Sequence, residues 1–179
     1  MRIERVRLMP PPDADLQLGY WIASMDDVRE DLKQSLKGRI SEKELVWQSY
    51  QGGSSIGVLL LHIAHTEAWW IEEMIAGGRL SDSFKKDYLF KEFGPGKPAP
   101  PAPRKPYQWY FEKMDKVRTR TRKILLKHRD DDLDTIRYQE EGYERIEFSI
   151  RWIFYHLIEH EAHHRGQILM LRNLFRHTK

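Results

Sequence analysis

The sequence of this 179-residue chain predicts an all-α protein, a four-helix bundle, and three observations support that fold class. Four long stretches carry apolar residues at the spacing of amphipathic helices. Each stretch is bounded by residues that commonly begin or end helices. Only one short segment, residues 136–148, alternates between apolar and polar residues as a pair of strands does. We therefore expect four packed helices, with a long proline-rich crossover between the second and the third.

The first helix is expected to follow the prolines at positions 10–12. Asp13 can cap a helix over residues 14–37, which Gly38 would end. A capping box begins at Ser41, but glycines follow it within about a dozen residues, so we expect only a short helix or turn there.

The second helix is expected over residues 56–76, capped by the serines at 54 and 55 and ended by the glycines at 77 and 78. Its side chains are apolar nearly all round, which indicates a helix buried on most sides. Residues 79–106 then become rich in proline, so we expect a largely extended crossover that wraps the surface or covers the mouth of a site.

The third helix is expected over residues 107–128, and the aspartates at 130–132 break it. Residues 136–148 alternate on both sides of a glutamate and a glycine, which predicts a small hairpin. The last stretch, residues 149–179, contains no proline and carries basic residues near its end. With Ser149 as its cap, it is predicted to form one long C-terminal helix.

Length and composition limit the number of domains, the partners and the metal ligands that this protein can have. The length suits a single domain over residues 1–179. The formal net charge is only +3 and charges of both signs are mixed, so we expect no nucleic-acid partner. No apolar run resembles a signal peptide, and the most apolar helix carries histidines and glutamates, so we expect a cytoplasmic protein with no membrane partner. Cysteine is absent, so any metal must be held by His, Asp or Glu.

The last helix places two histidines in its apolar face. His160 and His164 are four residues apart, on the same face as Leu157 and Leu171. A buried imidazole must be hydrogen-bonded or bound to something. Two readings remain open for the pair alone: satisfied core histidines, or two ligands of one ion, since their Cβ atoms are about 5–6 Å apart.

A third ligand would have to come from another helix. His62 is the best candidate, because it lies near the middle of the buried second helix as His160 and His164 do in theirs. Three histidines and one open position are typical of catalytic rather than structural metal sites. Since neutral imidazoles leave the ion's charge uncompensated, an anionic fourth ligand such as hydroxide or a substrate thiolate is favoured.

The string from His160 to His164 is also a literal H-E-x-x-H, the zinc-protease motif. The longer metzincin form would require glycine and histidine where Gln167 and Met170 stand. The 15 residues after His164 are all expected in the same helix, so we expect no downstream helix that carries a glutamate ligand. We therefore give the protease reading little weight.

Two segments carry a resemblance to a known family: residues 61–70, Leu-His-Ile-Ala-His-Thr-Glu-Ala-Trp-Trp, and residues 156–168, around His-Glu-Ala-His-His-Arg-Gly-Gln. Together they resemble the DinB/YfiT-like family. The resemblance implies a four-helix bundle of up-down-down-up topology with a divalent metal on three histidines. Carried over by motif, these ligands are His62, His160 and His164.

The resemblance fixes fold and metal better than substrate. Members of such families include thiol-dependent S-transferases and a thiol-dependent maleylpyruvate isomerase, and many others are described only as metal-dependent hydrolases. Our leading hypothesis is a thiol-dependent S-transferase acting on small electrophiles, with a low-molecular-weight thiol as cosubstrate. The alternatives are a hydrolase that uses a metal-bound hydroxide and a non-catalytic metal-binding stress protein. Nickel, zinc, manganese and iron are not distinguished by an all-imidazole site, and a homodimer is left open.

The remaining histidines of these segments, His65, His156 and His163, are rotated away from the ligand face, so we expect them to flank the site and to matter little for metal binding. Glu67 and Glu161 are also rotated off that face. We expect them on the surface or in contact with the ligand histidines.

Three tryptophans, Trp69, Trp70 and Trp152, are expected to pack in the core or line a pocket wall. Gln167 is expected to hydrogen-bond a ligand histidine or merely to lie beside the site.

Overall fold

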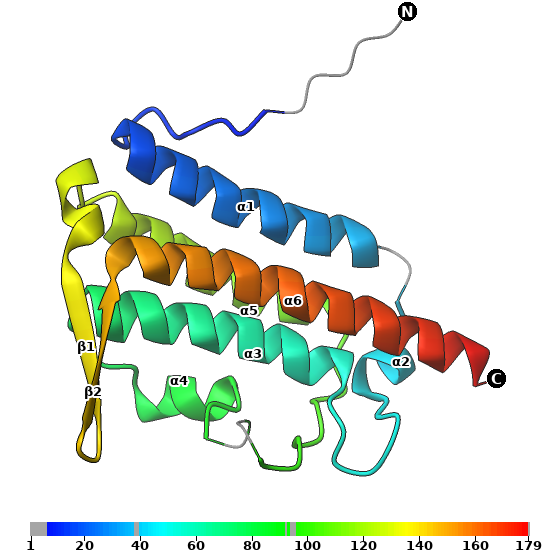
Figure 1. Ribbon diagram of the computed structural model, residues 1–179. Helices are drawn as coiled ribbons and strands as arrows, with labels where there is room; N and C mark the ends of the chain where they lie inside the picture. The colour runs from blue at the N-terminus through cyan, green and yellow to red at the C-terminus, as the bar shows by residue number, and fades with distance from the viewer. Residues whose placement is uncertain (1–6, 38–39, 92, 94–95, 179) are drawn as a thin grey trace, which may run out of the picture.

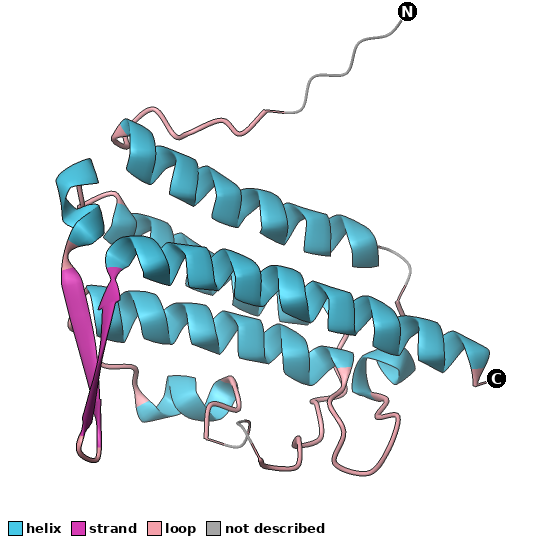
Figure 2. Ribbon diagram, in the orientation of Figure 1, coloured by secondary structure: helices cyan, strands magenta, loops and turns pink. Residues whose placement is uncertain are grey.

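The structure, a computed structural model, describes residues 7–37, 40–91, 93 and 96–178. Within these residues the chain is mostly helical, with six α-helices and one two-stranded hairpin (Figures 1 and 2). The α-helices are α1 (Leu16–Leu36), α2 (Glu42–Val46), α3 (Ile56–Ala68), α4 (Asp82–Asp87), α5 (Tyr107–Leu125) and α6 (Ile150–His177). A π-helical segment (Trp69–Ile75), a 3₁₀ turn (Asp130–Asp134) and strands β1 (Ile136–Glu141) and β2 (Glu144–Ser149) complete the described elements.

The four long helices lie side by side (Figure 1). Helix α3 packs against α5 and α6, and α1 packs against α6 and α5, which is consistent with the predicted bundle. The hairpin stands at one end of the helices (Figure 2). Two clusters of buried apolar side chains fill the interior, one that includes Leu32, Leu60 and Met114 and another that includes Ile22, Ile71 and Phe154.

Hydroxyl caps begin two of the long helices where the sequence predicts. The Ser55 side chain accepts a hydrogen bond from the backbone N–H of Val58 at 3.4 Å, and Ser149 accepts one from that of Trp152 at 3.1 Å. These caps satisfy N–H groups that a helix leaves without partners. Gly77 ends the second predicted helix as expected, at a φ of 69°. Such a left-handed glycine is a common way for a helix to end.

The cap predicted for the first helix is wrong. Asp15, not Asp13, occupies the N-cap position of α1, and its side chain makes no capping bond. Its carboxylate instead accepts from the backbone N–H of Asp130 at 3.2 Å and from Arg129 at 2.9 Å. Asp130 in turn accepts from the backbone N–H of Leu18 at 2.8 Å, so the 3₁₀ turn supplies the cap from a distant part of the chain. Gly38, expected to end this helix, lies outside the described residues.

The second predicted helix is not regular throughout. After Ala68 it widens into the π-helical segment Trp69–Ile75, where the N–H of Ala76 donates to the carbonyl of Ile71 at 3.0 Å. A π turn holds an extra residue relative to an α turn, so side chains beyond it are rotated relative to those before it.

The crossover contains a helix that we did not predict. Ser81 caps α4 by accepting from the N–H of Phe84 at 3.1 Å, and the helix starts with an aspartate and ends near two lysines. It closes with Leu89 at a φ of 53°, where the N–H of Leu89 donates to the Lys86 carbonyl at 3.3 Å and that of Phe90 to the Lys85 carbonyl at 2.8 Å. This is a Schellman arrangement, completed by a leucine in the left-handed region that glycine usually occupies.

The later crossover is extended, as predicted, and packs on the bundle. The N–H of Ala99 donates to the Gly52 carbonyl at 2.8 Å, and the Tyr110 hydroxyl donates to the Pro103 carbonyl. Gly57 lets this tyrosine approach α3, because a Cβ at that position would lie 2.5 Å from the Tyr110 hydroxyl oxygen.

The predicted hairpin is confirmed. Strands β1 and β2 pair antiparallel, with Ile136 opposite Ser149 and Glu141 opposite Glu144. Gly142 adopts a φ of 62° in the turn. Glycine reaches this conformation at little cost, because it has no Cβ. Since β2 ends at Ser149, the hairpin leads directly into the cap of α6.

Candidate metal centre

Three histidines from two helices converge where α3 faces α6. His62 comes from α3, and His160 and His164 are one turn apart on α6. The Nε2 atom of His160 lies 3.0 Å from that of His62 and 3.1 Å from that of His164. One ligand atom from each of the three lies within 4.8 Å of the others, and none of the three side chains is fully exposed.

The partners of His62 determine which of its nitrogens carries the proton. His65 Nδ1 lies 2.9 Å from the Tyr88 carbonyl oxygen, which can only accept, so this nitrogen donates. In a neutral His65, Nε2 is then an acceptor, and it lies 2.9 Å from His62 Nδ1. His62 Nδ1 therefore carries the proton, and the lone pair of its Nε2 faces the other two histidines.

A second contact makes the same assignment for His164. Its Nδ1 lies 2.7 Å from Gln167 Oε1. Since Oε1 is an acceptor, Nδ1 donates and Nε2 carries the lone pair. The amide nitrogen of Gln167 donates to His163 Nε2 at 2.9 Å, which supports this orientation of the amide. Gln167 thus hydrogen-bonds one of the candidate ligands, the first of the two roles considered for it.

The arrangement of the three nitrogens suits a shared cation better than hydrogen bonds among the imidazoles. His62 and His164 both direct a lone pair at His160 Nε2, which can offer one proton at most. Two nitrogens 3.0–3.1 Å apart would subtend an angle of about 95° at an ion bound at the usual length of about 2.0–2.1 Å. The donor set is therefore one that could bind a divalent metal.

Burial keeps these imidazoles in the neutral form that metal binding needs. Burial, with His65, His160 and His164 nearby, lowers the pKa of His62 to about 2. Burial and the neighbouring His164 lower the pKa of His160 to about 3. The pKa of His164 is lowered as well, chiefly by burial, although Gln167 acts in the opposite direction. Loss of solvation disfavours the charged imidazolium in each case.

The other histidines of the two segments lie outside the group of three. His156 stacks on Trp152, with ring centroids 5.0 Å apart and planes 3° from parallel. His163 is exposed. His65 is buried, 5% exposed, but it contacts His62 at Nδ1, the ring nitrogen that does not face the other two candidate ligands.

Aromatic rings surround the site. Phe93 lies against His62 with centroids 4.6 Å apart, and Phe90 lies 5.0 Å from His65. The three tryptophans differ in exposure. Trp70 is buried, Trp69 is partly buried against both apolar clusters, and Trp152 is 39% exposed. Core packing is confirmed for Trp70 and Trp69, whereas Trp152 packs on the rings of Trp70 and Phe148 from an exposed position.

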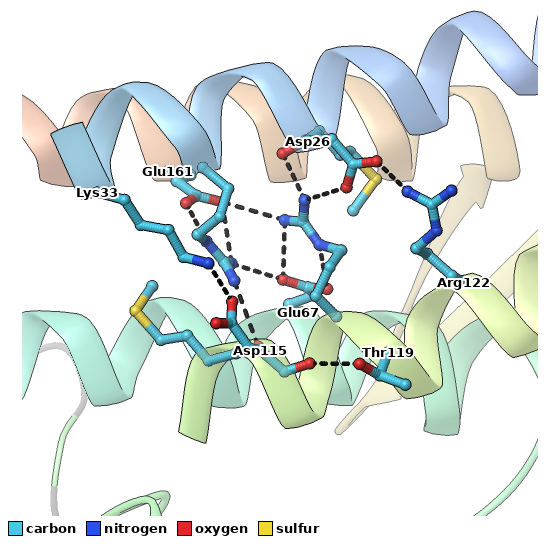
Figure 3. Close-up of polar contacts among 11 residues, drawn as sticks. Asp26, Lys33, Glu67, Asp115, Thr119, Arg122 and Glu161 are labelled. Carbon is cyan, nitrogen blue, oxygen red and sulfur yellow. Dashed lines mark hydrogen bonds and ion pairs between the residues drawn. The ribbon is translucent and has the colours of Figure 1, made fainter. Parts of the chain in front are cut away.

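Our expectation for Glu67 and Glu161 is wrong. Both carboxylates are almost fully buried and pair with arginines between the helices (Figure 3). Glu67 accepts from Arg118 Nε at 2.8 Å and from Arg29 Nη2 at 2.8 Å. Glu161 accepts from Arg29 Nη2 at 3.1 Å and from Arg118 Nη2 at 3.3 Å. We call these four residues the ion ring.

Each long helix contributes one member to the ion ring. Along α1, α5 and α6 that member falls between the two apolar clusters, and on α3 Glu67 precedes Ala68, the last residue of the first cluster. Burial alone would raise the pKa of Glu67, but Arg118 and Arg29 lower it to about 2. Burial likewise opposes the charge of Arg118, but Glu67 and Glu161 outweigh it and raise the pKa of this arginine. Glu161 is therefore occupied by arginines, which argues against the general-base role that H-E-x-x-H would give it.

Sequence reasoning did not identify the two arginines of the ring. The signal was present: Arg29 stands between Met25 and Leu32 in the apolar stripe of the first helix, and Arg118 follows Met114 in that of the third. A charge at a core position requires a buried partner of opposite sign.

No described helix is both long enough and apolar enough to cross a bilayer.

Comparison with known proteins supplies the family. No curated protein matches this chain. A family model described as Mycothiol-S-transferase matches residues 21–177, a span that includes His62, His160 and His164. The match covers most of the chain and agrees with the resemblance to DinB/YfiT-like proteins. The chain therefore belongs to the mycothiol S-transferase family, which is part of the DinB/YfiT-like superfamily and whose own members are mycothiol-dependent S-transferases.

Proposed function

We propose that this protein joins the thiol of mycothiol to a small electrophile at a divalent metal ion held by His62, His160 and His164. The observation that carries this proposal is the convergence of three Nε2 atoms from two helices, with that of His160 at 3.0 Å and 3.1 Å from the other two. Family membership supports the thiol and the transfer. Family membership also favours thiol transfer over the alternatives of a hydrolase and a non-catalytic stress protein.

The bound ion would stabilise the thiolate form of the cosubstrate at neutral pH. The protein's own part is to hold three neutral imidazoles, which contribute no negative charge and so favour an anionic sulfur as the next ligand. Gln167 orients His164 by accepting its Nδ1 proton. The chain contains no cysteine, so the reacting sulfur comes from the cosubstrate.

The transfer forms one bond between sulfur and the electrophilic carbon. In a substitution the leaving group departs with its bonding electron pair, and the thiol proton passes to solvent. In an addition the electron pair of the double bond takes a proton instead. The Phe93 ring beside His62 and the half-exposed Trp152 beyond His156 give apolar surface suited to a small organic electrophile.

The test is metal-dependent adduct formation. Purified protein loaded with nickel, zinc, manganese or iron is incubated with mycothiol or other low-molecular-weight thiols and a panel of electrophiles, and adducts are measured by mass spectrometry. We expect turnover that a chelator removes and that His160→Ala lacks. Cleavage of an ester or amide without any thiol would favour the hydrolase, and metal binding without turnover for any pair would favour the non-catalytic protein.

The finer features of the fold belong to the same proposal. We infer a single domain over residues 1–179 with up-down-down-up topology, which is supported by α1 and α6 running one way and α3 and α5 the other (Figure 1). The homodimer that the sequence left open and the cytoplasmic location stay predictions.

A further inference from the structure

His65 is a buried polar side chain beside a proposed metal ligand, and the proposed function does not itself require it. It is one turn from His62 on α3 and 5% exposed. Its two ring nitrogens each lie 2.9 Å from a partner, Nδ1 from the Tyr88 carbonyl and Nε2 from His62 Nδ1. His65 is thus the link between a backbone carbonyl and a candidate ligand.

The Tyr88 carbonyl is available because of how α4 ends. The Schellman arrangement uses the carbonyls of Lys85 and Lys86 and places Tyr88 at the C-cap, whose carbonyl has no partner within the helix. Leu89 turns the chain at this point in a left-handed conformation. The same turn brings the Phe90 ring onto His65, with centroids 5.0 Å apart.

We propose that His65 is a positioning residue: its Nδ1 donates to the Tyr88 carbonyl, so its Nε2 accepts from His62 Nδ1. His65 thereby selects the His62 tautomer whose Nε2 is free to bind metal. The proposal rests on the metal site proposed above. The carbonyl requires a donor at His65 Nδ1, so neutral His65 presents an acceptor at Nε2. His62 must then donate from Nδ1, which leaves its Nε2 without a proton and aimed at His160.

A purely structural histidine would predict different behaviour. If His65 only filled space, phenylalanine would replace it with no effect on the proton of His62. Glutamine would have no advantage over phenylalanine, although its amide carries a donor and an acceptor about as far apart as the two ring nitrogens. The two substitutions therefore separate positioning from packing.

The experiment compares wild type, His65→Phe, His65→Gln and the control His156→Phe. His156 also adjoins the site, but it meets His160 through a ring contact with centroids 5.7 Å apart. The first readout is the tautomer of His62 in the metal-free protein, from long-range ¹H–¹⁵N correlation spectra. The second is the affinity for Zn²⁺, from competition with a chromophoric chelator.

We expect His62 to be protonated at Nδ1 in wild type, in His156→Phe and in His65→Gln, and to populate the Nε2–H tautomer in His65→Phe. Metal affinity should fall about 10- to 100-fold in His65→Phe, the usual effect of removing a partner of a ligand histidine, and not stay nearly unchanged as the sequence alone suggested for His65. His65→Gln should recover most of that loss, and His156→Phe should match wild type.

An unchanged His62 tautomer in His65→Phe would overturn the proposal, as would an Nε2–H tautomer in wild type. If His65→Phe does not fold, His65→Gln decides: a His62 that keeps its Nδ1 proton together with near-wild-type metal affinity supports the proposal, and an Nε2–H tautomer in that folded variant overturns it. Failure of the metal site itself gives a separate result: wild type would bind no divalent ion while the tautomers still follow position 65.

Discussion

Replacing Glu161 by glutamine tests the ion ring and the reading of H-E-x-x-H together. The substitution keeps the shape of the side chain and removes one of two buried negative charges, while two buried arginines remain. Arg29 then keeps Glu67 at 2.8 Å but loses its contacts to a carboxylate on α6, and Arg118 loses one at 3.3 Å. The four side chains are between 3% and 9% exposed, so water cannot easily compensate.

Removing one partner from a buried ion pair costs about 3–5 kcal/mol. Since a domain of this kind is stable by only about 5–15 kcal/mol, Glu161→Gln should lose a large share of the unfolding free energy. The assay is urea denaturation of metal-free protein followed by circular dichroism. The control is Glu159→Gln, two residues away and exposed. As a surface substitution, it should change the unfolding free energy by roughly 0.5 kcal/mol or less.

Two further measurements make the reasoning refutable. Turnover per folded molecule at low temperature should be nearly unchanged, because Glu161 contacts arginines and not the reacting groups. The double variant Glu161→Met with Arg29→Met should be more stable than Glu161→Gln, since it removes charges of both signs. A loss of unfolding free energy below about 1 kcal/mol in Glu161→Gln would refute the claim that the ion ring is inaccessible to water. A large loss of turnover in a variant that stays folded would instead favour Glu161 as a general base.

Three other predictions concern the ligands, acid and the crossover. His62→Ala, His160→Ala and His164→Ala should each lose most of the bound metal in elemental analysis, whereas His156→Ala and His163→Ala should retain it; full occupancy in His62→Ala would show that the wrong histidine on α3 was chosen. The folded pKa values of His62 and His160, about 2 and about 3, lie below the unfolded value of about 6.5. The two histidines therefore contribute their full share of stability above about pH 6.5, and this share is lost as the pH falls from there toward the folded pKa values. Urea denaturation of metal-free protein at about pH 5 should therefore show a loss of about 2 kcal/mol per histidine relative to neutral pH, and His62→Phe should reduce that loss; a pH-independent value would contradict the assignment. Gly57→Ala should lower the unfolding free energy by about 1–3 kcal/mol, because its Cβ would lie 2.5 Å from the Tyr110 hydroxyl. Gly166→Ala, with no atom within 4 Å of its Cβ, should leave the unfolding free energy unchanged or raise it in the same urea denaturation assay.

The long helices could be predicted because local chemistry and tertiary packing agree in them. Ser55, Ser149 and Gly77 stand where a regular apolar pattern begins or ends, so caps and periodicity give the same boundaries. The candidate ligands followed from similar reasoning, since His160 and His164 share one apolar face and His62 lies at a matching level. An imidazole in the core requires a partner whichever way the helices pack.

What could not be predicted depends on contacts between distant residues. The α1 cap comes from Asp130, and nothing near Leu18 in the sequence indicates it. Glu67 and Glu161 could be placed on a helix face, but whether that face meets water or Arg118 is decided by the packing of four helices. Helix α4 is a different case: Ser81 and the acid-to-base order after it are a local signal that the nearby prolines outweighed in our interpretation.

The π-helical segment Trp69–Ile75 has a consequence for how this family is compared. Such a segment corresponds to one residue inserted into an α-helix, and it lies after His62 and before the stop at Gly77. A relative that kept a regular helix here would need one residue fewer to reach the same end. Alignments that hold His62 and Gly77 in register should therefore place a single-residue gap within 69–75. Deleting one residue there should give a straight helix in which the side chains on one side of the deletion face about 100° away from their present partners.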